Sequence, residues 1–140
     1  MSNSSPKMCR ALFINPYKAE VTEVQLPLDE PEPIQQLLDC RCFTTAGRIG
    51  DDVLFVDDEG LFGATHFFRI PGVNGGQPLA GKGVVIGDDG EGGSADTVTQ
   101  LDQLRDSVRW VYAMDNNGDV LFDVKASARG QAARTEVVVL

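Results

Sequence analysis

Short apolar runs alternate with polar, glycine-rich breaks along the chain, and this pattern predicts a fold made mainly of short strands. In the first half of the chain the runs are "CRALFINP" (9–16), "AEVTEVQLP" (19–27) and "DDVLFVDDEGLFGATHFF" (51–68). The first two predict an antiparallel hairpin, with Pro16 at the end of its first strand. The third predicts a second hairpin that turns at Asp58-Glu59-Gly60, because glycine readily adopts the left-handed turn conformation.

Between the two predicted hairpins lies a segment with the signals of a short helix, "LDEPEPIQQLLDC" (28–40). Asp29 with Glu32 three residues later has the spacing of a capping box, and Pro33 suits the first helical position. The apolar residues that share one face of this helix are Ile34, Leu37 and Leu38. We expect a helix of about two turns.

The second half of the chain begins with "RIPGVNGGQPLAG" (69–81), which has no periodicity and predicts a loop. "KGVVIGDD" (82–89) predicts a short buried strand, and "GDDGEGGSADT" (87–97) predicts a polar loop. A second helix is expected in "TQLDQLRDSVRWV" (99–111), where Thr99 stands three residues before Asp102. Its apolar residues at helical spacing are Leu101, Leu104 and Val108.

The remainder of the chain predicts three closing strands, of which the last should dock in a sheet. These are "VRWVYAM" (108–114), "VLFDVKA" (120–126) and "TEVVVL" (135–140), separated by a turn at "DNNGD" (115–119) and a loop at "SARGQAAR" (127–134). The fold class is therefore α+β, a mostly antiparallel sheet with two short helices. The 140 residues suit one domain, which we place at 9–140 after a flexible N-terminus at 1–8.

Several of these segments together resemble one family of small proteins. The opening hairpin, the helix in "IQQLLDC", the acidic turn in "DDVLFVDDEGLFGA", the strand in "PLAGKGVVIGDD" and the helix in "LDQLRDSVRW" are similar to domain-of-unknown-function family 3846, as carried by phages and plasmids. The resemblance covers about residues 10–110 and leaves the closing strands at 111–140 outside it. It implies a fold and an origin in a mobile element, and it implies no activity.

The charge balance narrows the classes of partner. The sequence has 21 acidic and 12 basic residues and a formal net charge of −9. Such a field repels phosphate backbones, so we expect no direct binding to nucleic acid, and an anionic ligand would need a local basic pocket. The sequence has no uncharged stretch long enough to predict a membrane span, and its polar start "MSNSSPKMCR" lacks the apolar region of a signal peptide. We therefore expect a cytoplasmic protein without membrane contact.

The three cysteines, Cys9, Cys40 and Cys42, predict reduced thiols. Together with His66, the only histidine, they would supply enough ligands for one zinc ion. Structural zinc sites, however, usually use two ligand pairs with a spacing of about two to four residues, and "CRC" has neither that spacing nor a partner pair. We expect no metal and no cofactor.

The acids Asp57, Asp58 and Glu59 are the main candidates for chemistry. Adjacent carboxylates can hold a hard cation, or act with His66 as an acid and base pair. The glycine directly after them and the apolar residues on both flanks favour a solvated turn instead. We assign no catalytic residue, and a small hydrolase or nucleotide-processing enzyme is the alternative function.

The candidate ligand site combines the loop 69–81 with the strands that border it, because long irregular loops in compact domains are disproportionately functional. The residues assigned to it are His66, Arg69, Asn74 and Lys82. The three basic residues would form one cationic spot on an acidic protein, where arginine can hold an anionic group through two parallel hydrogen bonds. Asn74 would add polar contacts.

These features favour a binding protein without catalytic activity. We expect an accessory protein of a mobile element that sequesters a small anionic ligand or inhibits a host protein, for instance one of a defence system. An acidic surface suits docking onto a basic groove, since charge complementarity speeds the encounter and orients the partners. A third hypothesis is a structural subunit, in which the "TEVVVL" strand pairs edge to edge in a homo-oligomer.

Overall fold

The structure is a computed structural model, and it describes residues 8–27, 29–59, 66–114 and 135–139. The strands are β1 (Met8–Asn15), β2 (Glu20–Pro27), β3 (Phe43–Ile49), β4 (Asp52–Asp57), β5 (His66–Arg69), β6 (Leu79–Ala80), β7 (Gly83–Asp88), β8 (Ser94–Ala95), β9 (Arg109–Met114) and β10 (Thr135–Val139). The helices are α1 (Glu32–Leu38), the short 3-10 helix η1 (Asn74–Gly76) and α2 (Leu101–Ser107). The predicted α+β class, with mostly antiparallel strands and two short α-helices, is confirmed. The predicted turn glycine Gly60 and the elements predicted at 115–134 lie outside the described residues.

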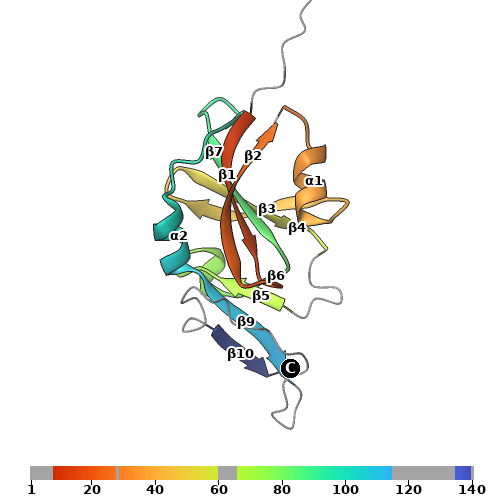
Figure 1. The fold of residues 1–140 in the computed structure, drawn as a ribbon, viewed down its shortest axis with the longest axis vertical. Coiled ribbons are helices and arrows are strands. Elements are labelled where there is room, and N and C mark those ends of the chain that lie inside the picture. The colour runs from red at the N-terminus through yellow and green to blue at the C-terminus, as the bar shows by residue number, and fades with distance from the viewer. Residues whose placement is uncertain (1–7, 28, 60–65, 115–134, 140) are drawn as a thin grey trace, which may run out of the picture.

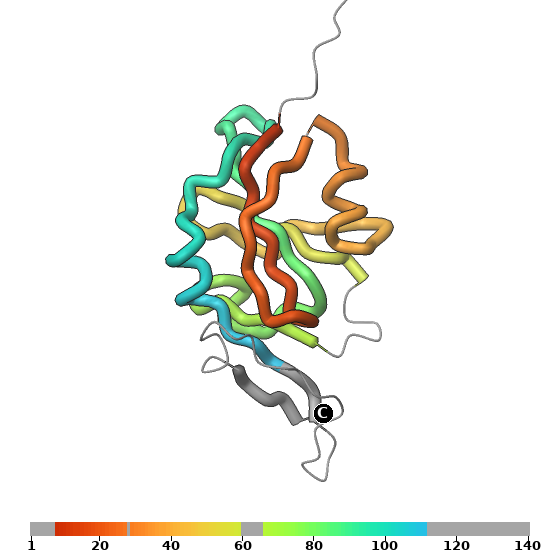
Figure 2. The backbone as a smooth tube through the Cα atoms, in the orientation of Figure 1, coloured from red at the N-terminus to blue at the C-terminus, as the bar shows by residue number. Residues whose placement is uncertain are grey.

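Two sheets form the framework (Figure 1). The larger has the order β2-β1-β7-β4-β3 with antiparallel neighbours, and β8 pairs with the end of β7. The smaller has the order β10-β9-β5-β6, in which β10 runs parallel to β9 and the other pairs are antiparallel. The hairpin of β1 and β2 and the docking of the last strand in a sheet are therefore confirmed. In the tube view, β5, β6 and β9 lie beneath the turn of the first hairpin (Figure 2).

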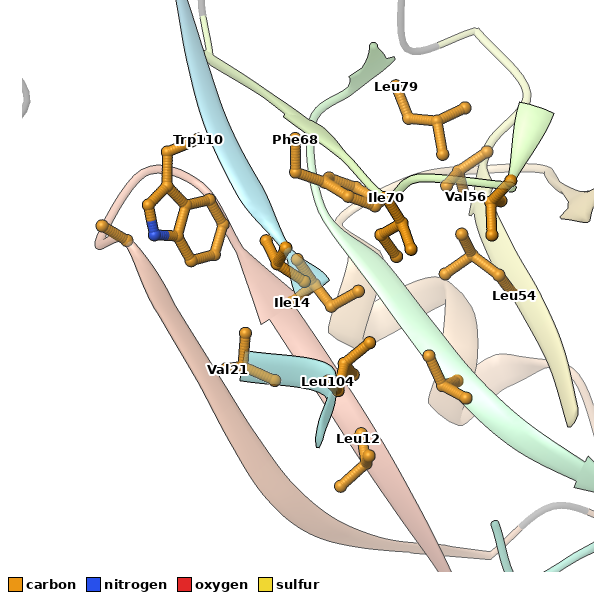
Figure 3. Packing of buried hydrophobic residues seen from close by; sticks show 14 residues of the cluster. Leu12, Ile14, Val21, Leu54, Val56, Phe68, Ile70, Leu79, Leu104 and Trp110 are labelled. Carbon is orange, nitrogen blue, oxygen red and sulfur yellow. The ribbon is translucent and has the colours of Figure 1, made fainter. Parts of the chain in front are cut away.

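The larger sheet is buried on both faces, which explains the continuous apolar run of β7. On one face it packs against α1 through a cluster of Ala11, Ile34, Leu38, Val84 and Ile86. On the other face it packs against α2 and the smaller sheet through a cluster that includes Leu12, Ile14, Leu54, Val85, Phe68, Leu104 and Trp110 (Figure 3). Alternate residues of β1 and β7 thus belong to different cores, as the two-residue period of a strand requires.

A buried carboxylate holds the segment that leads into α2. Asp52, which is 1% exposed, accepts hydrogen bonds from the hydroxyl groups of Thr97 and Thr99. Its carboxylate also accepts hydrogen bonds from the backbone N–H groups of Val98, at 3.1 Å, and Thr99, at 2.9 Å. The predicted capping role of Thr99 is wrong, because α2 has Gln100 at its N-cap position and no side-chain cap. The Thr99 hydroxyl binds Asp52 instead.

The predicted hairpin across residues 51–68 is also wrong. Its two strands form as β4 and β5, but β4 pairs with β3 and β7 in the larger sheet while β5 pairs with β6 and β9 in the smaller. Both hydrogen-bonding edges of β4 are therefore already occupied. The acidic turn itself is present: the N–H of Glu59 donates to the carboxylate of Asp57 at 2.9 Å, and the N–H of Asp58 donates to the carbonyl of Cys42 at 3.0 Å.

Three further local features differ from the sequence prediction. Helix α1 has Pro31 at its N-cap position and no side-chain cap, so Asp29 does not form the predicted capping box. The predicted loop 69–81 contains η1 and the short strand β6. Strand β3 was not predicted, because it is an edge strand with exposed polar positions and an irregularity between Thr45 and Gly47 that breaks its alternation.

Candidate functional site

An exposed tyrosine on a fixed turn forms the centre of the candidate site. Tyr17 lies between β1 and β2, and its backbone N–H donates to the side-chain oxygen of Asn15 at 3.1 Å. Asn15 is only 8% exposed, and its carbonyl accepts the N–H of Lys18 at 3.3 Å. The backbone on both sides of Tyr17 is thereby held, while the tyrosine itself remains 45% exposed.

The imidazole of His66 packs on this tyrosine. His66 is the first residue of β5, and the centroid of its ring lies 4.6 Å from that of Tyr17, with the ring planes inclined by 39°. Burial lowers the pKa of His66 below its ordinary value. Since that ordinary value is about 6.5, the imidazole is mainly neutral at pH 7.

Lys82 reaches the same tyrosine from the connection between β6 and β7. The preceding residue, Gly81, has a φ of +77°, which glycine adopts without strain, and its N–H donates to the carbonyl of His66 at 3.0 Å. This hydrogen bond places Lys82 beside the start of β5. The Lys82 Nζ lies 5.9 Å from the centroid of the Tyr17 ring, at the outer limit of a cation–π contact.

The other two predicted site residues lie elsewhere. Arg69 is three residues after His66 on β5, so strand alternation directs the two side chains to opposite faces, and Arg69 is in register with Arg109 on β9. Asn74, in η1, lines a separate cavity of about 170 Å³ together with Val56, Asp57, Asp58, Pro78, Leu79 and Ala80. The structure thus brings together His66 and Lys82 of the predicted set, with Tyr17 between them.

A larger cavity lies at the end of α1 and the start of the acidic turn. Its volume is about 590 Å³, and its lining residues are Glu32, Gln35, Gln36, Asp39, Cys40, Arg41, Asp57 and Glu59. The side-chain amide of Gln35 donates to the carbonyl of Arg41 at 2.7 Å. Arg41 forms an ion pair with Glu59 at 3.5 Å, and both side chains are mostly exposed to solvent, so this contact stabilises little.

The carboxylates of Asp39 and Asp57 in this lining also affect the Tyr17 phenol electrostatically. Burial raises the pKa of the Tyr17 phenol, and the negative charges of Asp57 and Asp39 raise it further. The pKa of the Cys40 thiol is raised to about 11, first by burial and then by Asp57, Cys42 and Asp39. Both groups therefore stay protonated at neutral pH. The hydroxyl of Tyr17 is available as a hydrogen-bond donor.

The hypothetical zinc ligands are dispersed. Cys9 is buried in β1, Cys40 and Cys42 follow α1, and all three thiols are free. Within the part of the chain that the structure describes, no group of three or more His, Cys, Asp or Glu side chains could hold a metal ion.

A comparison with models of protein families shows to which family this chain belongs. A model for a domain of unknown function, DUF3846, matches residues 9–109. The chain belongs to the DUF3846 family. This region contains Tyr17, His66 and Lys82, and it agrees with the resemblance seen in the sequence. Neither a curated protein nor a solved structure matches the chain.

Tyr17 is the residue of the candidate site that sequence reasoning missed. The available signal was a large aromatic residue in the polar turn "NPYKAE" of a predicted hairpin. Its partners could not be found in this way, because His66 and Lys82 are far from it in the sequence.

No helix among the described residues has the length and apolar character needed to cross a bilayer.

Proposed function

We propose that this DUF3846 protein is a cytoplasmic binding protein without catalytic activity, encoded by a mobile element, and that it sequesters a small ligand through an anionic group held at Tyr17, His66 and Lys82. The proposal is carried by one observation: an exposed tyrosine, fixed by its backbone, contacts an imidazole and an ammonium group. On a chain with a net charge of −9, this arrangement places one positive charge, that of Lys82, beside an exposed hydrogen-bond donor. The origin in a mobile element rests on the resemblance to phage and plasmid proteins.

Each of the three side chains contributes differently to the binding of an anion. Lys82 supplies a positive point charge, the phenol of Tyr17 supplies a hydrogen-bond donor, and the ring of His66 packs on Tyr17 and so helps to position it. Because Asn15 already fixes the turn, binding costs little ordering of the backbone around Tyr17. The same groups would also accept a carboxylate on a host protein, so inhibition of such a protein is the competing outcome.

Native mass spectrometry of the purified full chain, in parallel with identification of co-purified proteins, tests this proposal. We expect the wild type to retain a small anionic compound. The Tyr17→Ala and Lys82→Ala variants should each retain at least about tenfold less of it, the effect expected for the loss of one hydrogen bond or charge contact. Arg48→Ala is the matched control, because it also removes one positive charge but lies on β3, where Arg48 pairs with Asp88 at 3.1 Å.

The possible results separate the hypotheses. A host protein retained in place of a small compound would favour inhibition. A compound that all four proteins retain equally would reject the site at Tyr17. Conversion of the retained compound by the wild type would favour the hydrolase hypothesis over sequestration.

A further inference from the structure

An asparagine–glycine pair forms the centre of η1. Asn74 has a φ of +54° and Gly75 a φ of +64°, and the N–H of Gly76 donates to the carbonyl of Val73 at 2.9 Å. Positive φ at both central positions is the requirement of a type I′ turn, which favours Asn-Gly. We propose that this turn is also a modification site, at which Asn74 loses its side-chain amide through attack by the backbone nitrogen of Gly75. The inference is independent of the ligand site at Tyr17.

The proposed reaction needs water and no cofactor. The backbone nitrogen of Gly75 attacks the side-chain carbonyl carbon of Asn74, the nitrogen loses its proton, and the amide group leaves as ammonia. The product is a cyclic imide that joins the two residues. Water then opens the ring: addition at the side-chain carbonyl gives aspartate, and addition at the backbone carbonyl gives isoaspartate. In total, an amide and water become a carboxylate and ammonium.

The first requirement is an accessible attacking nitrogen. The two backbone hydrogen bonds of this turn come from the N–H groups of Gly76 and Gln77, and the N–H of Gly75 takes part in neither. Apart from its neighbours in the chain, no heavy atom of the described residues lies within 4 Å of the position that a Cβ on Gly75 would occupy. The space beside this nitrogen is therefore open for ring closure.

The second requirement is an amide that water can reach beside a residue that can attack it. Asn74 and Gly75 are both exposed. Asn15 is the opposite case, because it is only 8% exposed and precedes Pro16, which has no N–H to lose. Among the asparagines that the structure describes, Asn74 alone meets both conditions.

The modification changes the charge of a cavity wall. Asn74 lines the 170 Å³ cavity together with Asp57 and Asp58, so a carboxylate at position 74 adds a third like charge to this lining. The isoaspartate form also adds a carbon atom to the main chain inside η1. Older molecules of the protein therefore become more negative at this turn than newly made ones.

Peptide mass spectrometry of the full chain during prolonged incubation tests the proposal. In the peptide that contains Asn74 we expect the loss of ammonia and then the mass of an aspartate, in separate aspartate and isoaspartate peaks. The reaction should be faster in mildly alkaline than in mildly acidic buffer, because the attacking nitrogen must lose a proton. Since no opening of the fold is needed, native and urea-denatured protein should convert Asn74 at rates that agree within about tenfold.

Two variants and one internal control accompany this measurement. Asn15 lies in the same protein and should remain unmodified. Asn74→Gln should show no conversion over the same period, because the longer side chain would have to close a larger ring. Asn74→Asp supplies the acidic product as a standard, with which the new band of the wild type should coincide in isoelectric focusing. Circular dichroism shows whether each variant is folded.

Two results would overturn the proposal. A native rate more than about tenfold below the denatured rate would show that the fold protects the pair. Conversion of Asn117, which also precedes a glycine in the sequence, without conversion of Asn74 would show the same.

Discussion

Asp51 and Asp52 are adjacent and chemically identical, yet the structure gives them opposite roles. Asp51 is exposed in the turn before β4, whereas Asp52 is 1% exposed and accepts hydrogen bonds from residues 97–99. Burial alone raises the pKa of Asp52, but the bonds from Thr97, Thr99 and the backbone of Val98 together hold it below its usual value. The charged form of Asp52 therefore joins β4 to the segment before α2.

Asp52→Asn should lower the free energy of unfolding by about 2–3 kcal/mol, because the amide group of asparagine would face donors that now bind a charged acceptor. Urea denaturation at pH 7 measures this change. Asp51→Asn is the control and should alter stability by no more than about 0.5 kcal/mol. Similar values for the two variants would contradict the role assigned to Asp52.

The pH dependence of stability provides a second test of Asp52. Its pKa is lower in the folded protein than in the unfolded chain, where the value is about 3.9. Its stabilising effect is thus fully present above that unfolded value and is lost as the pH falls through the folded value. We expect the stability gap between the wild type and Asp52→Asn to be constant from pH 5 to 7 and to narrow below about pH 4. A gap that widens in acid would contradict this reasoning.

The three thiols should react in a fixed order. Cys42 is exposed, Cys9 is buried, and burial together with nearby negative charge raises the pKa of Cys40 to about 11. At pH 8 only about one Cys40 in a thousand is then a thiolate, the reactive form. Alkylation followed by peptide mass spectrometry should show Cys42 modified first, Cys40 much later and Cys9 only after unfolding. Labelling in denaturant is the control, and equal rates for Cys40 and Cys42 in the native protein would be inconsistent with this environment.

At the scale of elements, β7 is the strand on which the larger sheet depends. It pairs with β1 on one side and β4 on the other, and its end pairs with β8. Residues from Gly83 to Gly87 are buried, so neighbouring segments approach it on both faces. This close approach explains why glycines stand inside a strand, where they would otherwise weaken it.

Gly87→Ala should destabilise this element strongly. A Cβ atom at Gly87 would collide with the backbone carbonyl of Asp96, and that segment cannot move freely because the Asp96 carboxylate accepts the N–H of Arg10 at 2.7 Å. We expect a loss of more than about 2 kcal/mol in urea denaturation. Glu91→Ala, an exposed change in the adjoining loop, is the control and should have only a small effect on stability. A similarly small effect of Gly87→Ala would refute the close approach.

At the scale of the whole molecule, one apolar cluster joins both sheets and α2. It includes Ile14 and Val85 from the larger sheet, Phe68 and Trp110 from the smaller, and Leu104 from α2. The smaller sheet therefore shares its core with one face of the larger sheet, whose other face packs on α1. We therefore expect the two sheets to unfold together.

Trp110 makes this expectation measurable, since it is the only tryptophan and is 2% exposed between the sheets. Its fluorescence and the far-ultraviolet circular dichroism should give the same urea midpoint. Leu104→Ala should lower both midpoints equally, at a cost of about 2–5 kcal/mol. Separate midpoints for the two signals would show that the sheets are independent units.

The candidate site was only partly predictable from the sequence. His66 and Lys82 could be selected because basic residues are few and these two flank a glycine-rich loop. Tyr17 was missed, and Arg69 was grouped with His66 although strand alternation places the two on opposite faces of β5. A side chain's neighbours across the fold depend on the packing of distant segments, which local patterns do not encode.

Elements with a local periodicity can be predicted from the amino-acid sequence without the structure. The alternation or continuous apolar character of β1, β2, β4, β7 and β9, the glycine and proline breaks, and the helical spacing in α1 and α2 were sufficient to predict the α+β class. Three features are visible only in the folded chain: β4 and β5 belong to different sheets, Asp52 is a buried acceptor, and Tyr17 lies against His66 and Lys82. The physical reason is that periodicity fixes which face of a strand is buried, whereas partners are chosen when distant edges compete for the same hydrogen bonds and the same core.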